Sequence, residues 1–135
     1  MVDLTITAAN VDAGTDGEIG TGVAGVAITA GKLIYLDRTT NTYLLADADA
    51  LASSKVAGVA VSDAAAGQIV AFQRSGTYTA GGTTVAGTPY FVSATAGGIC
   101  PIADLSSADY ISLFGFGASA STIKIMRTWS QIALA

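Results

Sequence analysis

Short runs of aliphatic and aromatic residues, separated by turn residues, recur along the whole chain. Turns such as Ser75-Gly76 and Gly81-Gly82 divide these runs from one another. Many short apolar runs at this spacing predict an all-β fold, a small β-barrel or sandwich of short antiparallel strands. The expected strands span residues 23–29, 33–37, 42–46, 56–62, 68–74, 77–79, 90–93, 98–102, 110–119 and 122–127.

The N-terminal part of the chain begins with a strict alternation of apolar and polar residues. Val2, Leu4 and Ile6 are separated by polar side chains, which predicts a strand with one apolar face. Residues 10–25 are rich in Gly, Asp and Thr, as loops are. Residues 1–25 are therefore expected to form an N-terminal strand and a Gly-rich extended arm.

A helical pattern occurs in residues 47–54, whose sequence is DADALASS. Asp47 or Asp49 is a suitable N-cap, and Ala and Leu follow. The chain length suits one core, so residues 1–135 are expected to form a single β domain. Residues 126–135 are expected to form a C-terminal tail of that domain.

A weak internal repeat of about 57 residues underlies the strand pattern. Residues 30–47 align with residues 86–104, and both stretches run from Ala-Gly through two short strands to Ala-Asp. Further on, residues 56–60 can be set beside residues 113–117, and each is followed by a loop and another strand. The pattern predicts two similar four-strand halves; chance similarity in a chain rich in Ala, Gly and Thr is the alternative.

Composition restricts the chemistry that this chain can perform. Of the 135 residues, 51% are hydrophobic and 12% are charged, and histidine is absent. Mechanisms that use imidazole as base or metal ligand are therefore excluded. The lone Cys100 excludes an internal disulfide and a thiolate-cluster metal site. We expect no catalytic residues, so the protein is predicted not to be an enzyme.

Two glycine-containing motifs resemble ligand-binding loops but lack the required context. Residues 20–25 match the dinucleotide pattern GxGxxG, yet a β-like run follows where a helix N-terminus is needed. Asp12, Asp16 and Glu18 resemble a calcium loop, yet Val23 stands where the closing bidentate Glu belongs. We therefore predict no cofactor and no metal site.

The charged residues limit the partners. The formal net charge is -4, and the cations are scattered singly, so nucleic-acid binding is not expected. The most apolar stretch, residues 23–36, is shorter than a bilayer crossing needs, so membrane insertion is not expected either. The scattered cations are Lys32, Lys55, Lys124, Arg38, Arg74 and Arg127.

The aromatic residues fall mostly in the expected strands, where they serve the core. Trp129 differs, because it lies near the chain end, followed by Ile132 and Leu134 and by no charged side chain. Packing on its own domain is one interpretation. Docking on a neighbouring subunit is the other.

Four stretches in collinear order carry a resemblance to a known family. They are VDLTITAANV, ITAGKLIYLDRTTNTYLLADADA, VAGVAVSDAAAGQIVAFQRSG and AGTPYFVSATAGGICPIAD, followed by a strand with Phe-Gly. From Val2 to Ile125 the chain resembles the capsid cement, or head decoration, proteins of tailed bacteriophages. The tail from Met126 to Ala135 has no counterpart in this resemblance.

The resemblance implies a small, mainly β, non-enzymatic protein on the outer surface of the mature phage head. Its expected partner is the major capsid protein, and a homo-oligomer is expected, first a trimer and second a dimer. Val2, Leu4 and Ile6 could add as a strand to a capsid sheet edge, and Trp129, Ile132 and Leu134 are the other expected contacts. A carbohydrate- or receptor-binding β module of a phage fibre or cell surface is the alternative.

Overall fold

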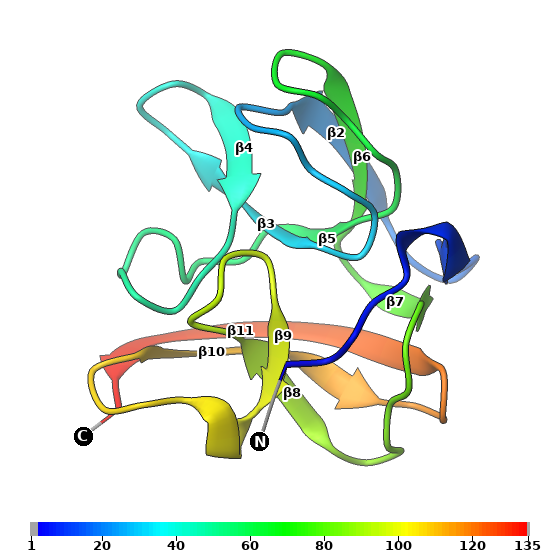
Figure 1. Ribbon diagram of the computed structural model, residues 1–135, viewed down its shortest axis with the longest axis vertical. Helices are drawn as coiled ribbons and strands as arrows, with labels where there is room; N and C mark the ends of the chain where they lie inside the picture. Colours follow the sequence, from blue (N-terminus) through cyan, green and yellow to red (C-terminus); the bar gives the residue numbers. More distant parts are fainter. Residues whose placement is uncertain (1–2, 135) are drawn as a thin grey trace.

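The chain folds into two antiparallel β-sheets (Figure 1). This computed structural model describes residues 3–134. The six-stranded sheet has the order β1-β7-β11-β10-β8-β9, and the five-stranded sheet has the order β2-β6-β5-β3-β4. Helical structure among these residues is limited to the 3-10 turns η1 (Ala8–Asn10) and η2 (Ile102–Asp104). The predicted all-β fold is therefore confirmed.

The strands are short, with two exceptions near the C-terminus. The six-stranded sheet contains β1 (Val11–Asp12), β7 (Gly76–Ala80), β8 (Pro89–Val92), β9 (Ile99–Pro101), β10 (Tyr110–Gly117) and β11 (Thr122–Ala133). The five-stranded sheet contains β2 (Ile19–Val23), β3 (Leu33–Asp37), β4 (Thr42–Leu45), β5 (Gly58–Ala60) and β6 (Ile69–Gln73).

The two sheets have the same internal strand order. In the first half of the chain, β2 to β6, the first strand pairs with the last, and the order continues through β5 and β3 to β4. In the second half, β7 to β11, the order β7-β11-β10-β8-β9 repeats this arrangement strand for strand. Each half thus contains one strand more than the predicted four, and β1 is added at the edge beside β7. The internal repeat is confirmed.

Matching glycines support this correspondence at the level of single residues. Gly58 of β5 and Gly115 of β10 occupy aligned positions in the two halves. A Cβ atom on Gly58 would collide with the carbonyl oxygen of Gln73, and one on Gly115 would collide with that of Lys124. In both halves, the next strand passes too close for any side chain at this position.

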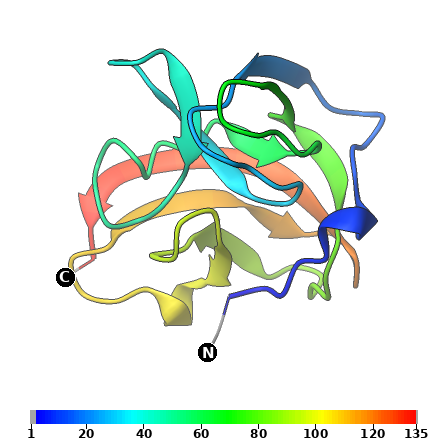
Figure 2. The ribbon, with the colours of Figure 1, turned by 45° about the horizontal axis from the view of Figure 1, so that its top comes forward.

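The five-stranded sheet curls until its two edges meet (Figure 2). A parallel bridge joins Ala24, just after β2, to Tyr43 of β4, and the Gly25 amide donates to the Tyr43 carbonyl at 2.8 Å. The result is a half-barrel lying on the six-stranded sheet. Its wall therefore has apolar residues on both faces, with Leu33 toward the six-stranded sheet and Ile34 toward the barrel interior.

The buried residues form two main clusters. The shared core lies between the sheets and draws on both halves, with members that include Leu33, Val59, Tyr78, Tyr90, Phe114, Ile123 and Ile125. The first-half core fills the half-barrel and consists of Ala24, Ile28, Ile34, Ala60, Ala64, Val70 and Phe72. The second half thus packs on the first, while the first has a core of its own.

Four local predictions were wrong, two of them in the N-terminal part. Residues 3–7 form no strand, although the Leu4 amide donates to the Ile99 carbonyl at 2.8 Å and the polar-apolar alternation holds in their burial. The predicted Gly-rich arm contains β1 and β2, because β2 completes the half-barrel.

The other two differences concern residues 47–54 and the chain end. Residues 47–54 fold as successive turns rather than a helix. Asp47 Oδ1 accepts a hydrogen bond from the Asp49 amide at 2.8 Å, which closes a turn instead of capping a helix. The expected tail from residue 126 continues β11 as far as Ala133, paired with β10.

Candidate functional site

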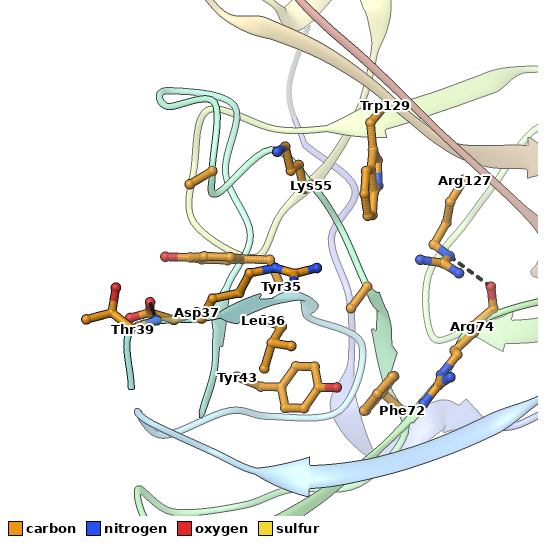
Figure 3. A pocket seen from close by; sticks show the side chains of 13 residues that line it. Tyr35, Leu36, Asp37, Thr39, Tyr43, Lys55, Phe72, Arg74, Arg127 and Trp129 are labelled. Atoms are coloured by element: carbon orange, nitrogen blue, oxygen red, sulfur yellow. Dashed lines mark hydrogen bonds between the residues drawn. The ribbon is translucent and has the colours of Figure 1, made fainter. Parts of the chain in front are cut away.

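A pocket of about 490 Å³ opens between the half-barrel and the far part of β11 (Figure 3). Trp129 and Arg127 enter it from β11, while Tyr43 and Phe72 face them from the five-stranded sheet. Its size falls in the range of small-ligand sites. The full lining is Tyr35, Leu36, Asp37, Arg38, Thr39, Tyr43, Ala52, Lys55, Ala57, Phe72, Arg74, Arg127 and Trp129.

The pocket collects most of the positive charge of the chain. Of the six cationic side chains, four line it: Arg38, Lys55, Arg74 and Arg127. The cations are scattered singly along the sequence, but the fold brings four of the six together in one pocket. The curl of the five-stranded sheet and the length of β11 bring together residues that lie far apart in the chain.

Arg127 is held in place by neutral partners. Its Nη1 donates to the Val56 carbonyl and its Nε donates to the Arg74 carbonyl, both at 3.2 Å. Partial burial lowers the pKa of the Arg127 guanidinium, and the nearby positive charge of Arg74 lowers it further. An anion in the pocket would relieve this unfavourable placement of charge.

Trp129 lies beside Arg127 and shares its anchor. Its Nε1 donates to the same Val56 carbonyl at 3.0 Å, and 41% of the residue is exposed. The hydrogen bond fixes the indole ring before any ligand arrives. The bond to Val56 shows that Trp129 packs on its own domain, the first of its two interpretations. The exposed part of its ring lines the pocket.

Arg74 has the one ion pair found among residues 3–134. Its Nη1 lies 3.1 Å from Glu18 Oε1, on the exposed surface, and its guanidinium sits 5.3 Å from the centre of the Phe72 ring. Such an exposed pair is weak. The pairing leaves three of the four pocket cations outside any ion pair within the described part of the chain.

Glycines of β2 make room for the aromatic side of the pocket. The Tyr43 ring lies against Gly22, and the Phe72 and Arg74 side chains lie against Gly20, so a Cβ at either glycine would collide with them. The rings of Tyr43 and Phe72 are in contact, with centroids 4.7 Å apart. The glycines of the GxGxxG motif thus have a packing role here.

Asp37 is the carboxylate in the pocket lining, and both of its oxygens accept hydrogen bonds from residues of its own turn. Its Oδ1 accepts from the Thr39 amide at 3.0 Å, and its Oδ2 accepts from the Thr40 hydroxyl at 3.2 Å. Desolvation raises the pKa of the neighbouring Tyr35, and the charges of Asp37 and Asp47 add to this. The Tyr35 hydroxyl therefore stays protonated at neutral pH.

The residues expected to contact a capsid at the N-terminus lie on their own domain. Leu4 and Ile6 are partly buried against the shared core, while Thr5 and Thr7 are exposed. Val2 lies outside the described residues. A role of Leu4 and Ile6 in strand addition would require this segment to leave its own core.

The residues expected at the C-terminus have three different surroundings. Trp129 lines the pocket, Leu134 packs on a small cluster around Cys100, and Ile132 is 66% exposed.

On the face of the six-stranded sheet turned away from the half-barrel, Met126 is 51% exposed, and Phe116 is also exposed. Phe116 lies between the buried Gly115 and Gly117, and Met126 follows the buried Ile125.

The buried thiol of Cys100 lies close to two carboxylates. The ligand atoms of Asp3, Cys100 and Asp104 lie within 4.8 Å of one another. Burial raises the pKa of Cys100 to about 12, and Asp3 and Asp104 contribute to the increase. Asp3 Oδ1 also accepts from the Ser93 hydroxyl at 2.7 Å. The thiol therefore keeps its proton at neutral pH in this arrangement.

The chain matches no protein-family model and no curated protein. Within residues 3–134, no helix has the length and hydropathy needed to cross a membrane.

Sequence reasoning did not find the pocket. The predicted strands place Tyr35, Tyr43 and Phe72 in the core, and of these only Phe72 is fully buried. The available signal was the alternation in the strand of residues 33–37 and in residues 122–133, which places Tyr35 and Arg127 on defined faces. It could not show that these faces meet.

Proposed function

We propose that this protein binds the outer surface of a tailed-phage capsid and stabilises the mature head. Support comes first from the ordered resemblance between residues 2 and 125 and the head decoration proteins. The major capsid protein is then the partner, and the virion surface is the location. A trimer, or secondly a dimer, fits a protein that occupies a symmetry axis of the shell.

The observation that carries this proposal is a pair of exposed apolar side chains, Phe116 and Met126, on the outer face of the six-stranded sheet. Within the described chain, no layer packs over Phe116 and Met126, although the opposite face of the same strands forms the shared core. Exposed apolar side chains on the outer face of a sheet favour contact with another protein. A subunit that touches several capsid proteins gains avidity even when each contact is weak.

A substitution on this face tests the docking. M126D places a charge on the outer face without touching the core, and we expect it to reduce occupancy on purified heads by about tenfold or more, since an unpaired charge at an interface is costly. I69D is the matched control, because Ile69 is 62% exposed on β6, the counterpart of β11. Equal loss of binding in both variants, or in neither, would contradict the docking face.

The N-terminal segment and the particle itself provide two further measurements. Deletion of residues 1–9 tests strand addition, and unchanged occupancy on heads would exclude it. A cryo-EM map of the parent particle would show the symmetry site and the number of subunits. A map without this chain on the outer surface would overturn the proposal.

A second candidate function is a carbohydrate- or receptor-binding module. The pocket favours it, because Tyr35, Tyr43 and Trp129 are aromatic side chains that are at least partly accessible around one cavity. Pull-down on host glycans compared with pull-down on empty heads separates the two functions. Retention on heads alone supports the first, and retention on glycans alone supports the second.

A further inference from the structure

We propose that the pocket between the half-barrel and β11 binds an acidic sugar, a saccharide ring that carries a carboxylate. Arg38, Lys55 and Arg127 would pair with the carboxylate, and Tyr43 and Trp129 would pack on the ring. The inference rests on the second candidate function and deepens it by naming a site and a ligand class. It does not depend on capsid docking, which uses another face of the molecule.

The arrangement of charge is the first argument. The lining brings four cations together with one carboxylate, Asp37, in a protein whose formal net charge is -4. Arg127 spends its two described hydrogen bonds on backbone carbonyls, and a guanidinium has five N–H donors. Donors therefore remain for a ligand. A guanidinium matches a planar carboxylate with two parallel hydrogen bonds.

The aromatic side chains are the second argument. Trp129 is oriented by its bond to the Val56 carbonyl, and Tyr43 is held by Phe72 and by the space that Gly22 leaves. Aromatic rings fixed in this way lose little freedom when they pack on the C–H face of a sugar ring. The pocket is thus ordered before binding.

Size and surroundings favour a sugar over a nucleic acid. A cavity of about 490 Å³ holds a ring compound rather than a continuous strand. The negative net charge of the protein would repel a polyphosphate chain, which a nucleic-acid-binding surface must attract. Each oxygen of Asp37 accepts one hydrogen bond within its own turn and has capacity for another, so Asp37 can accept from a sugar hydroxyl, while its charge opposes additional phosphate charge.

The binding test uses the full chain and two sugars that differ at one carbon. Galacturonic acid carries a carboxylate where galactose carries a hydroxymethyl group, and adenosine monophosphate serves as the nucleotide probe. In NMR titrations, we expect saturable binding of galacturonic acid that moves the signals of pocket residues. Galactose and the nucleotide are expected to bind at least about tenfold more weakly, because a charge-assisted hydrogen bond is lost or misplaced.

Charge-removing variants connect this binding to the pocket. R38Q and R127Q are each expected to weaken galacturonic acid binding by about tenfold. K124Q is the matched control, because Lys124 lies on β11 but faces away from the pocket, and it should stay within about twofold. The dispersion of each variant's NMR spectrum shows whether it is folded. R38Q carries the test if R127Q does not fold, since Arg38 is exposed.

Several outcomes would overturn the inference. They are equal binding of galactose, tighter binding of the nucleotide, equal loss in K124Q and R38Q, or no saturable binding of galacturonic acid. A chain that retains neutral host glycans but no acidic sugar would overturn the inference while the second candidate function stands. R38Q is expected to bind phage heads normally, and M126D is expected to bind the sugar normally. The two variants therefore test the sugar site and the capsid proposal independently.

Discussion

The two halves of the chain share one strand order and differ in the length of their last strand. β6 has five residues, whereas its counterpart β11 has twelve. β7 pairs only with Thr122–Ile125, so the remainder of β11 extends past it toward the first half. That extension carries Arg127 and Trp129 into the pocket. The first half supplies most of the pocket lining, and the part of β11 that departs from the repeat adds Arg127 and Trp129 on the opposite side.

The halves also differ in how they are buried. The first half has its own core around Phe72 in addition to the shared core. The second half depends on the shared core for most of its burial, and Phe114, which belongs to that core, has no exposure. The first half is thus the support on which the second half packs.

The largest expected effect comes from truncating these two phenylalanines. F72A and F114A should each lower the free energy of unfolding by about 3–5 kcal/mol, the usual loss for a buried ring. F114A should raise hydrogen exchange in both halves, and F72A mainly in β2 to β6, because only Phe114 belongs to the shared core. Denaturant titration and exchange mass spectrometry measure both. An F114A variant with unchanged exchange in the first half would contradict the comparison.

The matched glycines give the next largest effect. G58A and G115A should each destabilise the protein by about 1–3 kcal/mol, since the new methyl group meets backbone of the adjacent strand. Thermal unfolding measures the loss. G87A is the control, because a Cβ there meets no atom within 4 Å and only the left-handed backbone is unfavourable. Tolerance of one substitution and not the other would refute the equivalence of β5 and β10.

The smallest effect distinguishes two buried tyrosines of the six-stranded sheet. The Tyr78 hydroxyl is buried without a hydrogen-bond partner among the described residues, whereas the Tyr90 hydroxyl accepts from the Val85 amide at 3.1 Å. Y78F should therefore stabilise the protein by about 1 kcal/mol, and Y90F should destabilise it by about as much. If Y78F destabilises the protein in differential scanning calorimetry, as Y90F is expected to do, the Tyr78 hydroxyl has a hydrogen-bond partner in solution.

Much of the fold could be predicted from the sequence. The strand at residues 33–37 coincides with β3, and most other predicted strands overlap observed ones, because alternation and turn residues are local signals. The repeat was visible because each half reuses the same turn and strand pattern. β2 was missed because Gly20 and Gly22 resemble a loop, and only the neighbouring Tyr43 and Phe72 rings explain why they stand in a strand.

The candidate site could not be predicted in the same way. Its cations come from residues 38, 55, 74 and 127, which no sequence window contains together. Alternation places each side chain on a face of its strand, but the curl that brings the faces together arises from long-range pairing such as the bridge between Ala24 and Tyr43. Helix propensity in residues 47–54 likewise yielded to the turn that Asp47 closes.

The self-contained core of the first half has a consequence for synthesis on the ribosome. All seven buried members of that core lie between Ala24 and Phe72, so they have been translated before β7 begins. At about 5–20 residues per second, the first half gains a lead of several seconds over the rest of the chain. The half-barrel can therefore form first and serve as a template on which the emerging second half folds.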